Sequence, residues 1–416
     1  MLLRFAIILI CLAAALGCAQ AAEQRWRLDH VITTFWCPPP ATDAALAAVK
    51  AEHYTLTWAA EKDLDTVARH GLRAMLFEPL LQTPATLDDP AKKAQLDALI
   101  NRVKNHPALY AYFLTDEPNA STFPAWARLL AHLRTRDPAH LAYINLFPTY
   151  ATNEQLGNQG DTAAAYREHL KQFVETVKPS LISWDHYQMT KKGDAPQYVL
   201  NLELIREAAL EYQLPFLNII QASKFGPGMR RPNQDELRYL VYTTLAYGAR
   251  GISYFVYWNI PEMEGLYEDG KRTDLALDAA RLNAEVEALS PQLVALDSVG
   301  VYHTEPLPLG AQAAPKACPV RIAGKGEFVL GIFGSRVATP EGRLPKIADR
   351  RPQFAFMVVN RNYHQAASAQ VRVPPGRRVQ EFDRARRAWV GYAAPQAGMI
   401  TVRRAPGDGR LFRTVG

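Results

Sequence analysis

The feature that most constrains this chain is a regular alternation of short apolar runs with longer helix-like segments between Arg27 and about Leu296. Apolar runs of this length predict buried strands, and the segments between them predict helices. Strands that alternate with helices favour a parallel sheet, because each helix returns the chain to the start of the next strand. We predict eight strands, at 28–35, 54–58, 73–77, 109–114, 142–147, 181–186, 216–221 and 251–258.

The predicted helices lie between these strands and after the last one. They include 42–52, 91–104, 123–136, 163–178, 198–212 and 234–247, and a closing helix runs from 274 to about 289. Eight βα units favour a closed α/β fold, the (β/α)8 TIM barrel, which takes about 250 residues. A doubly wound open sheet is the alternative.

The remainder of the chain has a different pattern of apolar residues and turns. After Leu296, runs rich in Val, Phe and Tyr, such as 327–333 and 354–360, are separated by Gly and Pro turns. This pattern predicts a small C-terminal β-sandwich. We therefore divide the chain into a signal peptide (1–22), a catalytic barrel (23–296) and an accessory β-sandwich domain (297–416).

The first residues predict export. Arg4 precedes an apolar run, and small residues around Ala19-Gln20-Ala21 follow it, as in a secretory signal peptide. We expect a secreted or periplasmic protein. The alternative is a lipoprotein anchored at Cys18, although Ala15 stands where such signals usually have leucine. The apolar run is shorter than the about 20 residues that a membrane span needs, and no later segment resembles one.

Cysteine content and charge narrow the function classes. Cys37 and Cys318 remain after signal removal, and their spacing neither supports nor excludes a disulfide. Without CxxC or HExxH patterns, we expect no metal and no organic cofactor. From position 300 onward, 19 Lys and Arg stand against 7 Asp and Glu, a net charge of +12; since the whole chain carries +6, the earlier residues carry −6. Such a basic appendage favours anionic polymers or an anionic envelope surface, and a solvated arginine-rich face is the alternative. No basic motif interleaved with aromatic residues predicts nucleic-acid binding.

The fourth predicted strand carries the strongest chemical signal. The segment ALYAYFLTDEPN, residues 108–119, leads directly into Asp116, Glu117 and Pro118. Barrel enzymes hold their chemistry at the carboxyl ends of the strands. Cleavage of a glycosidic bond needs a carboxylic acid that protonates the leaving oxygen, so Glu117 is the leading catalytic candidate. Asp116 either accepts a hydrogen bond from substrate or raises the pKa of Glu117 by its charge. A salt-bridged carboxylate at the barrel rim is the alternative for Glu117.

The other strand ends add two acids, Glu78 and Asp185, and a set of aromatic and polar residues. Sugars combine apolar C–H faces with polar rims, so aromatic platforms flanked by hydrogen-bonding groups suit them. The candidate substrate-binding residues are Trp36, Trp58, Asn145, Trp184, His186, Tyr187, Gln221, Tyr257, Trp258 and Asn259. Each of them alone is also compatible with core packing. Strand alternation allows only one of His186 and Tyr187 to face a pocket.

At these residues the chain resembles the (β/α)8 glycoside hydrolases of clan A, which include beta-galactosidases and cellulase-like families. The Asp116-Glu117-Pro118 segment is close to the clan's Asn-Glu-Pro, which implies an acid/base role for Glu117. His186 and Tyr187 stand where the clan often has pocket residues. The segment from Leu245 to Trp258 is similar to the closing helix and strand of beta-galactosidase-like barrels, which implies that Trp258 lies under the sugar. The resemblance covers roughly residues 28–290.

The chain departs from the clan at the nucleophile. The clan's nucleophile is a glutamate at the end of the seventh strand, where this chain has Gln221, and a neutral amide cannot form the covalent glycosyl ester. Four explanations stay open. In the first, the strands align differently and another carboxylate is the nucleophile; in the second, Asp185 or Glu78 acts as a base that activates water. In the third, the substrate's own acetamido group attacks, with Asp116 orienting it and Glu117 donating the proton, as in beta-N-acetylhexosaminidases. In the fourth, the barrel binds glycans without cleaving them.

These observations predict a secreted glycoside hydrolase that cleaves O-glycosidic bonds of an oligo- or polysaccharide. Burial and Asp116 keep Glu117 protonated near neutral pH. Asp185 is the expected second carboxylate, with Glu78 behind it. We expect Trp258, Trp184 and Tyr187 to shape the sugar subsite and Asn145, His186 and Gln221 to bind its hydroxyls. A structural envelope protein that merely retains a barrel is a third class.

Overall fold

The computed structural model describes residues 26–335, 354–392 and 394–416. The predicted signal peptide and Cys18 lie outside these residues. Within them, no helix combines the length and the apolar character that crossing a bilayer requires. Cys37 and Cys318 are both free thiols.

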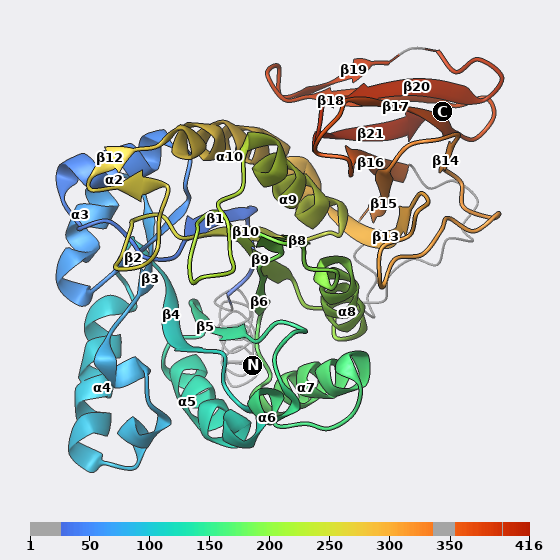
Figure 1. Ribbon diagram of the computed structural model, residues 1–416. Helices are drawn as coiled ribbons and strands as arrows, with labels where there is room; N and C mark the ends of the chain where they lie inside the picture. Colours follow the sequence, from blue (N-terminus) through green and yellow to red (C-terminus); the bar gives the residue numbers. More distant parts are fainter. Residues whose placement is uncertain (1–25, 336–353, 393) are drawn as a thin grey trace, which may run out of the picture.

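The N-terminal part of the chain is an eight-stranded parallel barrel, as the sequence predicts (Figure 1). Hydrogen bonds join neighbours in the order β1-β10-β9-β6-β5-β4-β3-β2. The barrel closes between the first two strands, where the Thr55 amide donates to the Thr33 carbonyl at 2.9 Å. The barrel strands are β1 (Ile32–Phe35), β2 (Leu56–Ala59), β3 (Arg73–Leu76), β4 (Leu109–Asp116), β5 (Leu141–Leu146), β6 (Ile182–His186), β9 (Phe216–Gln221) and β10 (Gly251–Phe255).

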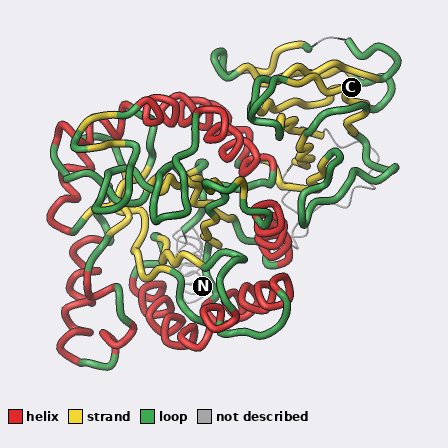
Figure 2. The backbone as a smooth tube through the Cα atoms, viewed as in Figure 1, coloured by secondary structure: helices red, strands yellow, loops and turns green. Residues whose placement is uncertain are grey.

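Helices surround the strands, and Figure 2 shows them as an outer layer. The α-helices are α2 (Asp43–Ala51), α3 (Leu64–Arg69), α4 (Pro90–Val103), α5 (Phe123–Arg136), α6 (Asn153–Leu156), α7 (Thr162–Val177), α8 (Tyr198–Glu211), α9 (Gln234–Ala246) and α10 (Asp274–Leu293). Short 3-10 helices occupy η1 (Glu61–Asp63), η2 (Pro79–Leu81), η3 (Pro84–Leu87) and η4 (Ala120–Thr122). Local chemistry sets several helix starts. At α9, Asn233 and Glu236 form a capping box, in which each side chain accepts from the other's backbone amide.

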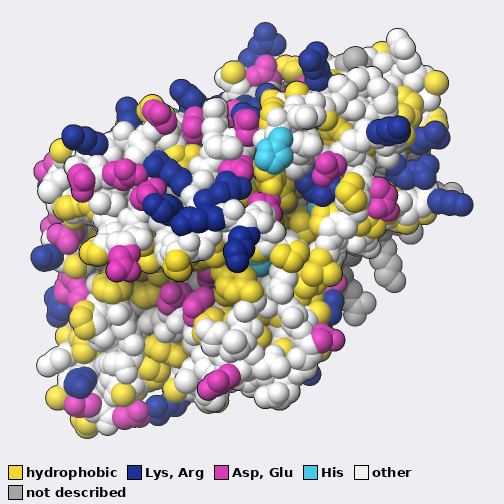
Figure 3. Space-filling view, in the orientation of Figure 1, with side chains coloured by type: hydrophobic (Ala, Val, Ile, Leu, Met, Phe, Trp, Pro, Cys, Tyr) yellow, Lys and Arg dark blue, Asp and Glu magenta, His cyan; other side chains and the backbone are white. Residues whose placement is uncertain are grey.

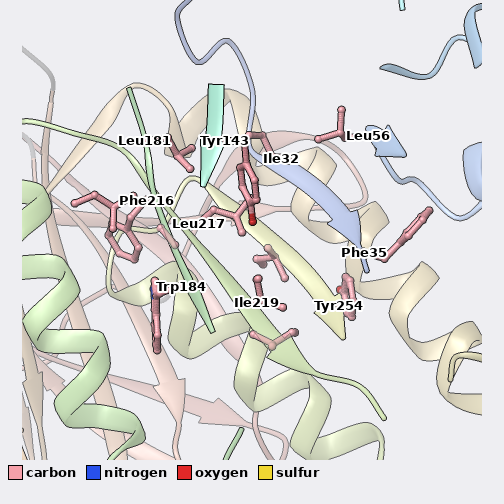
Figure 4. Close-up of a cluster of buried hydrophobic side chains, with 14 of the residues drawn as sticks. Ile32, Phe35, Leu56, Tyr143, Leu181, Trp184, Phe216, Leu217, Ile219 and Tyr254 are labelled. Carbon is pink, nitrogen blue, oxygen red and sulfur yellow. The ribbon is translucent and has the colours of Figure 1, made fainter. Parts of the chain in front are cut away.

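Two small hairpins decorate the barrel. They are β7 (Met189–Thr190) with β8 (Gly193–Asp194), and β11 (Tyr267–Glu268) with β12 (Lys271–Arg272). The barrel interior is packed with side chains such as Leu217 and Ile219, each 1% exposed (Figure 4). Burial of such a side chain contributes about 1.5–3 kcal/mol to stability, so the closed barrel rests on this core.

The C-terminal part contains antiparallel sheets (Figure 2). Six strands form one sheet: β13 (Leu296–His303), β15 (Phe328–Ser335), β16 (Phe354–Asn360), β21 (Gly409–Val415), β18 (Arg378–Asp383) and β19 (Ala388–Gly391). Three strands form another: β14 (Arg321–Ala323), β17 (Ala367–Arg372) and β20 (Met399–Arg404). Residues of both sheets, including Phe328, Phe356, Val371 and Val402, share one buried cluster. The finer description as a β-sandwich stays a prediction.

Helix α9 joins the two parts of the molecule. All residues from Tyr239 to Ala246 are buried, so no face of this segment meets solvent. One side of α9 packs on the barrel, and β15 and β16 pack against it from the C-terminal part. The approach is closest at Gly331 of β15, where an added Cβ would lie 2.3 Å from the Ala246 carbonyl oxygen.

This contact predicts a steric penalty for Gly331→Ala. The new methyl group would overlap backbone, which cannot yield as a flexible side chain does, so we expect a loss of about 1–3 kcal/mol in the free energy of unfolding. Gly391→Ala is the matched control, because a Cβ there meets nothing within 4 Å. Denaturant unfolding of the two variants measures the difference. Equal stabilities would contradict the close packing of β15 on α9.

Candidate active site

The candidate site begins with an irregularity in β4. Phe113 pairs with Tyr143 of β5, and Thr115 pairs with the next residue, Ile144, so Leu114 is extra in the ladder. Side chains alternate along a strand, and one extra residue therefore reverses which face the following residues occupy. As a result Asp116 pairs with Asn145 and lies on the same inward face as that residue. Without the bulge, Asp116 would face the helices.

Glu117 follows with an unusual backbone. Its φ is +47°, in the left-handed region that non-glycine residues seldom adopt. The Glu117 amide donates to the Asn145 carbonyl at 2.9 Å, which holds this turn against β5. Pro118 restricts the chain further, since its ring fixes its own φ. Backbone strain of this kind concentrates at functional sites. Here it ends the strand and keeps Glu117 close enough to Asp116 for the two charges to interact.

Asn145 connects two carboxyl groups. Its Nδ2 donates to Asp116 Oδ1 at 3.0 Å and to Asp185 Oδ1 at 2.8 Å. Its Oδ1 accepts from the Ser183 hydroxyl at 2.9 Å, and that hydroxyl also bonds with the Tyr143 hydroxyl at 2.6 Å. Because the Asn145 oxygen is occupied on this side, the amide must present its N–H groups to the carboxyls. Both donors of one amide are therefore committed to the acidic cluster.

Burial raises the pKa of all three carboxyl groups in this cluster, and repulsion from neighbouring charges adds to the shift at Glu117 and Asp185. Burial raises the pKa of Asp116, although its side chain is exposed, which indicates a group that opens into a concave site rather than bulk water. Burial and the charge of Asp116 raise the pKa of Glu117 to about 7. Asp185 is 4% exposed, and burial together with the Glu117 and Asp116 charges raises its pKa well above the ordinary value.

No cation among the described residues offsets this repulsion. In the described ranges, no Lys, Arg or His forms an ion pair with Asp116, Glu117 or Asp185. Like charges this close cannot all ionise, so the cluster holds at least one proton near neutral pH. Such a proton is available for transfer to a bound molecule.

Aromatic side chains line one side of the hollow at the carboxyl ends of the barrel strands, which we call the cleft. Trp36 and Trp58 have ring centroids 4.9 Å apart, and Trp58 lies 4.8 Å from Phe113. Phe77, 45% exposed, stacks on Phe113 at 5.7 Å. Figure 3 shows acidic side chains within this hollow, bordered by hydrophobic ones. An exposed ring beside carboxyl groups suits a ligand with both apolar and polar faces.

The opposite side of the cleft holds two tyrosines. Tyr187 packs at 4.9 Å from Phe255, and burial and the Asp185 charge raise its pKa. Tyr150 is 44% exposed; burial and the Asp185 charge raise its pKa, and it bonds to the Tyr187 backbone. Sequence reasoning missed Tyr150. The available signal was its position just after the fifth strand.

Alternation on β6 separates the remaining candidates there. Ser183, Asp185 and Tyr187 face the barrel interior, and Trp184 and His186 face the helices. Trp184 is fully buried in the core (Figure 4), so it offers no surface to a sugar. His186 is also fully buried; its Nδ1 bonds to Asn201 Oδ1 of α8 at 3.0 Å, and burial lowers its pKa to about 4. The structure therefore places both predicted sugar-binding residues away from the cleft.

Gln221 is the last residue of β9, the seventh barrel strand, and is fully buried. Its Oε1 accepts from the Met189 amide at 2.8 Å, and its Nε2 donates to the carbonyls of Met189 at 3.1 Å and Arg230 at 2.8 Å. These bonds tie two loops to the barrel. The predicted contact with sugar hydroxyls thus competes with backbone bonds that already use both ends of the amide.

The residues after the eighth barrel strand serve a hairpin. Tyr257 is 1% exposed and donates to Glu52 Oε2 at 2.9 Å. Trp258 stacks on Tyr267 of β11 at 5.7 Å, with an interplanar angle of 11°. Asn259 bonds to Asp269 and lines an open pocket of about 570 Å³ at the mouth of the barrel. Tyr257 is therefore withdrawn from solvent, whereas Trp258 and Asn259 are both half-buried.

Glu78 lies apart from the acidic cluster. Its Oε1 accepts from the Glu61 amide at 2.7 Å, and its charge raises the pKa of Arg102. Among the strand-end acids, the structure thus brings Asp116, Glu117 and Asp185 together and gives Glu78 a local structural contact. In the described part of the chain, no group of three or more His, Cys, Asp or Glu residues is arranged to hold a metal ion.

Comparison with known proteins supports the fold. No family model and no curated protein sequence matches the chain. Among solved structures, it is similar to a catalytic mutant of a GH42 beta-galactosidase from G. stearothermophilus, with a TM-score of 0.55 and 9% identity over 94% of this chain and 100% of that one. This likeness confirms the resemblance to the glycoside hydrolase barrel as a fold.

Two other solved structures have lower TM-scores against this chain. A GH30 endoxylanase from Clostridium papyrosolvens gives a TM-score of 0.46 and 11% identity over 92% of this chain and 95% of that one. A beta-galactosidase from Marinomonas ef1 gives a TM-score of 0.45 and 12% identity over 62% of this chain, which spans 60% of that protein's length.

The coupling between the adjacent acids predicts a measurable pKa change. In Asp116→Asn, loss of the negative charge should lower the pKa of Glu117 below about 7, and burial should keep it above the ordinary value of 4.5. Carbon-13 NMR titration of glutamate-labelled protein measures this pKa, with the Glu117 signal assigned by its loss in Glu117→Gln. Glu78→Gln is the control and should leave it unchanged. An unaltered Glu117 pKa in Asp116→Asn would show that the two charges do not interact.

Proposed function

We propose that this protein is a glycoside hydrolase in which Glu117 is the general acid. The observation that supports this proposal most is that the Glu117 carboxyl group has a pKa of about 7. A turn with a positive φ holds Glu117 at the carboxyl end of a barrel strand, beside exposed aromatic rings. Glycosidic cleavage needs such a proton donor near neutral pH. The likeness to a beta-galactosidase barrel supports the proposal through the fold alone.

The reaction follows from the three carboxyl groups. Glu117 gives its proton to the glycosidic oxygen, and the electron pair of the breaking C–O bond stays on that oxygen. Water adds to the anomeric carbon, and its proton passes to a carboxylate. Negative charge in the cluster stabilises the positive charge that develops on the sugar ring. Trp36 and Phe77 offer apolar surface to the sugar, and Tyr150 and Tyr187 offer hydroxyl groups.

Asp185 and Asp116 are the candidates for the second carboxylate. Asp185 is the choice that the sequence favours, and its bond to Asn145 places it in the cluster. It is also the more buried of the two, and burial and the charges of Glu117 and Asp116 raise its pKa. Asp116 is exposed to the cleft. Glu78 binds the Glu61 amide instead, and we assign it no catalytic role.

These facts favour one specific variant of the proposal, in which the substrate's own acetamido oxygen attacks the anomeric carbon. Gln221 cannot act as a nucleophile, and burial together with the Glu117 and Asp116 charges raises the pKa of Asp185, which disfavours the carboxylate form that a nucleophile needs. Asp116 can accept a hydrogen bond from the acetamido N–H and orient the group, while Glu117 protonates the leaving oxygen. The substrate class would then be 2-acetamido sugars.

We further propose that the enzyme acts outside the cytoplasm and that its C-terminal sheets form a β-sandwich accessory domain. The apolar N-terminal run supports export, because it has the length and flanking residues of a signal peptide. The buried cluster shared by the six-stranded and three-stranded sheets supports the sandwich.

Glu117→Gln tests the general acid. The amide cannot donate a proton at neutral pH, so kcat should fall by about 10²–10⁴ with little change in fold. In the parent, activity should fall as pH rises through about 7, since only protonated Glu117 is competent and its pKa is about 7. A panel of polysaccharides and nitrophenyl glycosides provides the substrates, and circular dichroism checks the fold. Glu78→Gln is the control with near-parental activity. Parental rates in Glu117→Gln would refute the role, and glycan affinity without turnover in the parent would identify a binding barrel instead.

Fluorinated substrates test the acetamido mechanism. Successive fluorines on the acetyl group withdraw electrons from the carbonyl oxygen, so kcat/KM should fall with each fluorine if that oxygen attacks. Asp116→Asn should lose more activity on the acetamido substrate than Asp185→Asn. A rate that is independent of fluorination would favour Asp185 as the base for water.

A further inference from the structure

Two arginines of the C-terminal part face each other, and neither has a carboxylate partner among the described residues. Arg321 of β14 and Arg372 of β17 are register partners in the antiparallel ladder. Like charges in directly opposite positions destabilise a sheet. Over residues 26–335, 354–392 and 394–416, no hydrogen bond or ion pair joins either guanidinium to a carboxylate. The fold therefore holds two positive groups together and leaves their neutralisation to something else.

Both arginines line a pocket of about 550 Å³. Lys325, on the Gly324–Gly326 turn, also lines it and likewise has no described ionic partner. Glu305 is the single acidic residue of the described lining, and its Oε2 accepts from the Leu307 amide at 3.1 Å. Three cations against one carboxylate leave the pocket with a positive charge.

The lining also carries groups that suit a sugar. The half-buried ring of Tyr302 and the hydroxyl-bearing Thr304 lie in the same pocket. His303 lines it as well; its Nε2 bonds with the Tyr247 hydroxyl at 2.9 Å, and its buried Nδ1 has no partner among the described residues. A guanidinium fork matches a carboxylate or sulfate group, and an aromatic face matches the C–H face of a pyranose.

Several other arginines of this part of the chain have partners among the described residues. Arg384 contacts Glu285, Arg404 contacts Asp408, and Arg413 lies over the Trp389 ring at 4.4 Å. Arg321 and Arg372 differ from them because they are opposite each other in a ladder and line one pocket. Figure 3 shows Lys and Arg side chains gathered at the side of the C-terminal part where Figure 1 places β14.

We propose that this pocket binds an anionic sugar unit of an acidic polysaccharide, through the carboxylate or sulfate group of that unit. A nucleic acid would need an extended groove with several stacking rings, whereas Tyr302 is the one Phe, Tyr or Trp ring in the described lining. The site would hold the polymer on the C-terminal part, separately from the carboxyl cluster of the barrel.

Binding by the full-length protein tests the site. Polygalacturonate and dextran sulfate supply carboxylate and sulfate groups, and unmodified dextran is the neutral control. Calorimetric titration should give a Kd for at least one anionic polymer that weakens by about tenfold or more in Arg372→Gln and further in the Arg321→Gln/Arg372→Gln double variant. Added salt should weaken the parent's binding. Arg386→Gln removes the same charge from an exposed residue outside the pocket lining, and it should bind as the parent does.

Two further measurements separate ligand binding from a structural role. Without polymer, the double variant should unfold at the same temperature as the parent or higher, because the repulsion between the arginines is gone. Its turnover of a short neutral glycoside should equal that of the parent, and binding should persist in Glu117→Gln, so loss of hydrolysis does not bear on this site. Unchanged affinity in the double variant, equal affinity for neutral dextran, or equally tight binding of single-stranded DNA or anionic vesicles would overturn the proposal.

Discussion

The extra residue in β4 is the constraint on which the candidate site depends. With Leu114 out of the ladder, Asp116 moves to the inward face and meets Asn145. Asn145 in turn bonds to Asp185, and the left-handed turn at Glu117 keeps a third carboxyl group beside the first two. A regular strand would present Asp116 to the helices and break this chain of contacts. One bulge therefore converts a structural strand into the wall of a cleft.

Burial and repulsion then define the chemistry. The cluster has a single amide as its shared donor and no described cation, so its charge is limited by proton uptake rather than by ion pairing. Burial and the neighbouring negative charges raise the pKa of Asp185, and they bring the pKa of Glu117 to about 7. The three acids thus differ in environment although they share one site, and differences of environment separate proton donors from permanent anions.

The sequence predicted the architecture well because periodicity records it directly. The eight barrel strands and the major helices between them lie where apolar runs and helical segments indicate, and Asp116 and Glu117 stand at a strand end as expected. Face assignments were less predictable, since a shift of one residue reverses every side chain on a strand. Trp184 and His186 were therefore predicted as site residues, but they face the helices and are buried. The sequence indicated that one of His186 and Tyr187 faces the pocket, and it did not indicate which one. The bulge at Leu114, the loop residue Tyr150 and the backbone bonds of Gln221 depend on tertiary contacts that no local pattern encodes.

The burial of α9 on all sides has a consequence for how such a chain can change in evolution. A helix with solvent on one face can lose a neighbouring domain and keep its polar side in water. The Tyr239–Ala246 stretch has no such side, because the barrel and the β15–β16 strands enclose it together. Removing the C-terminal part would leave an apolar wall in water, and a foreign module would have to reproduce the same surface. We therefore expect the two parts to be retained together in evolution and not to recombine as independent domains.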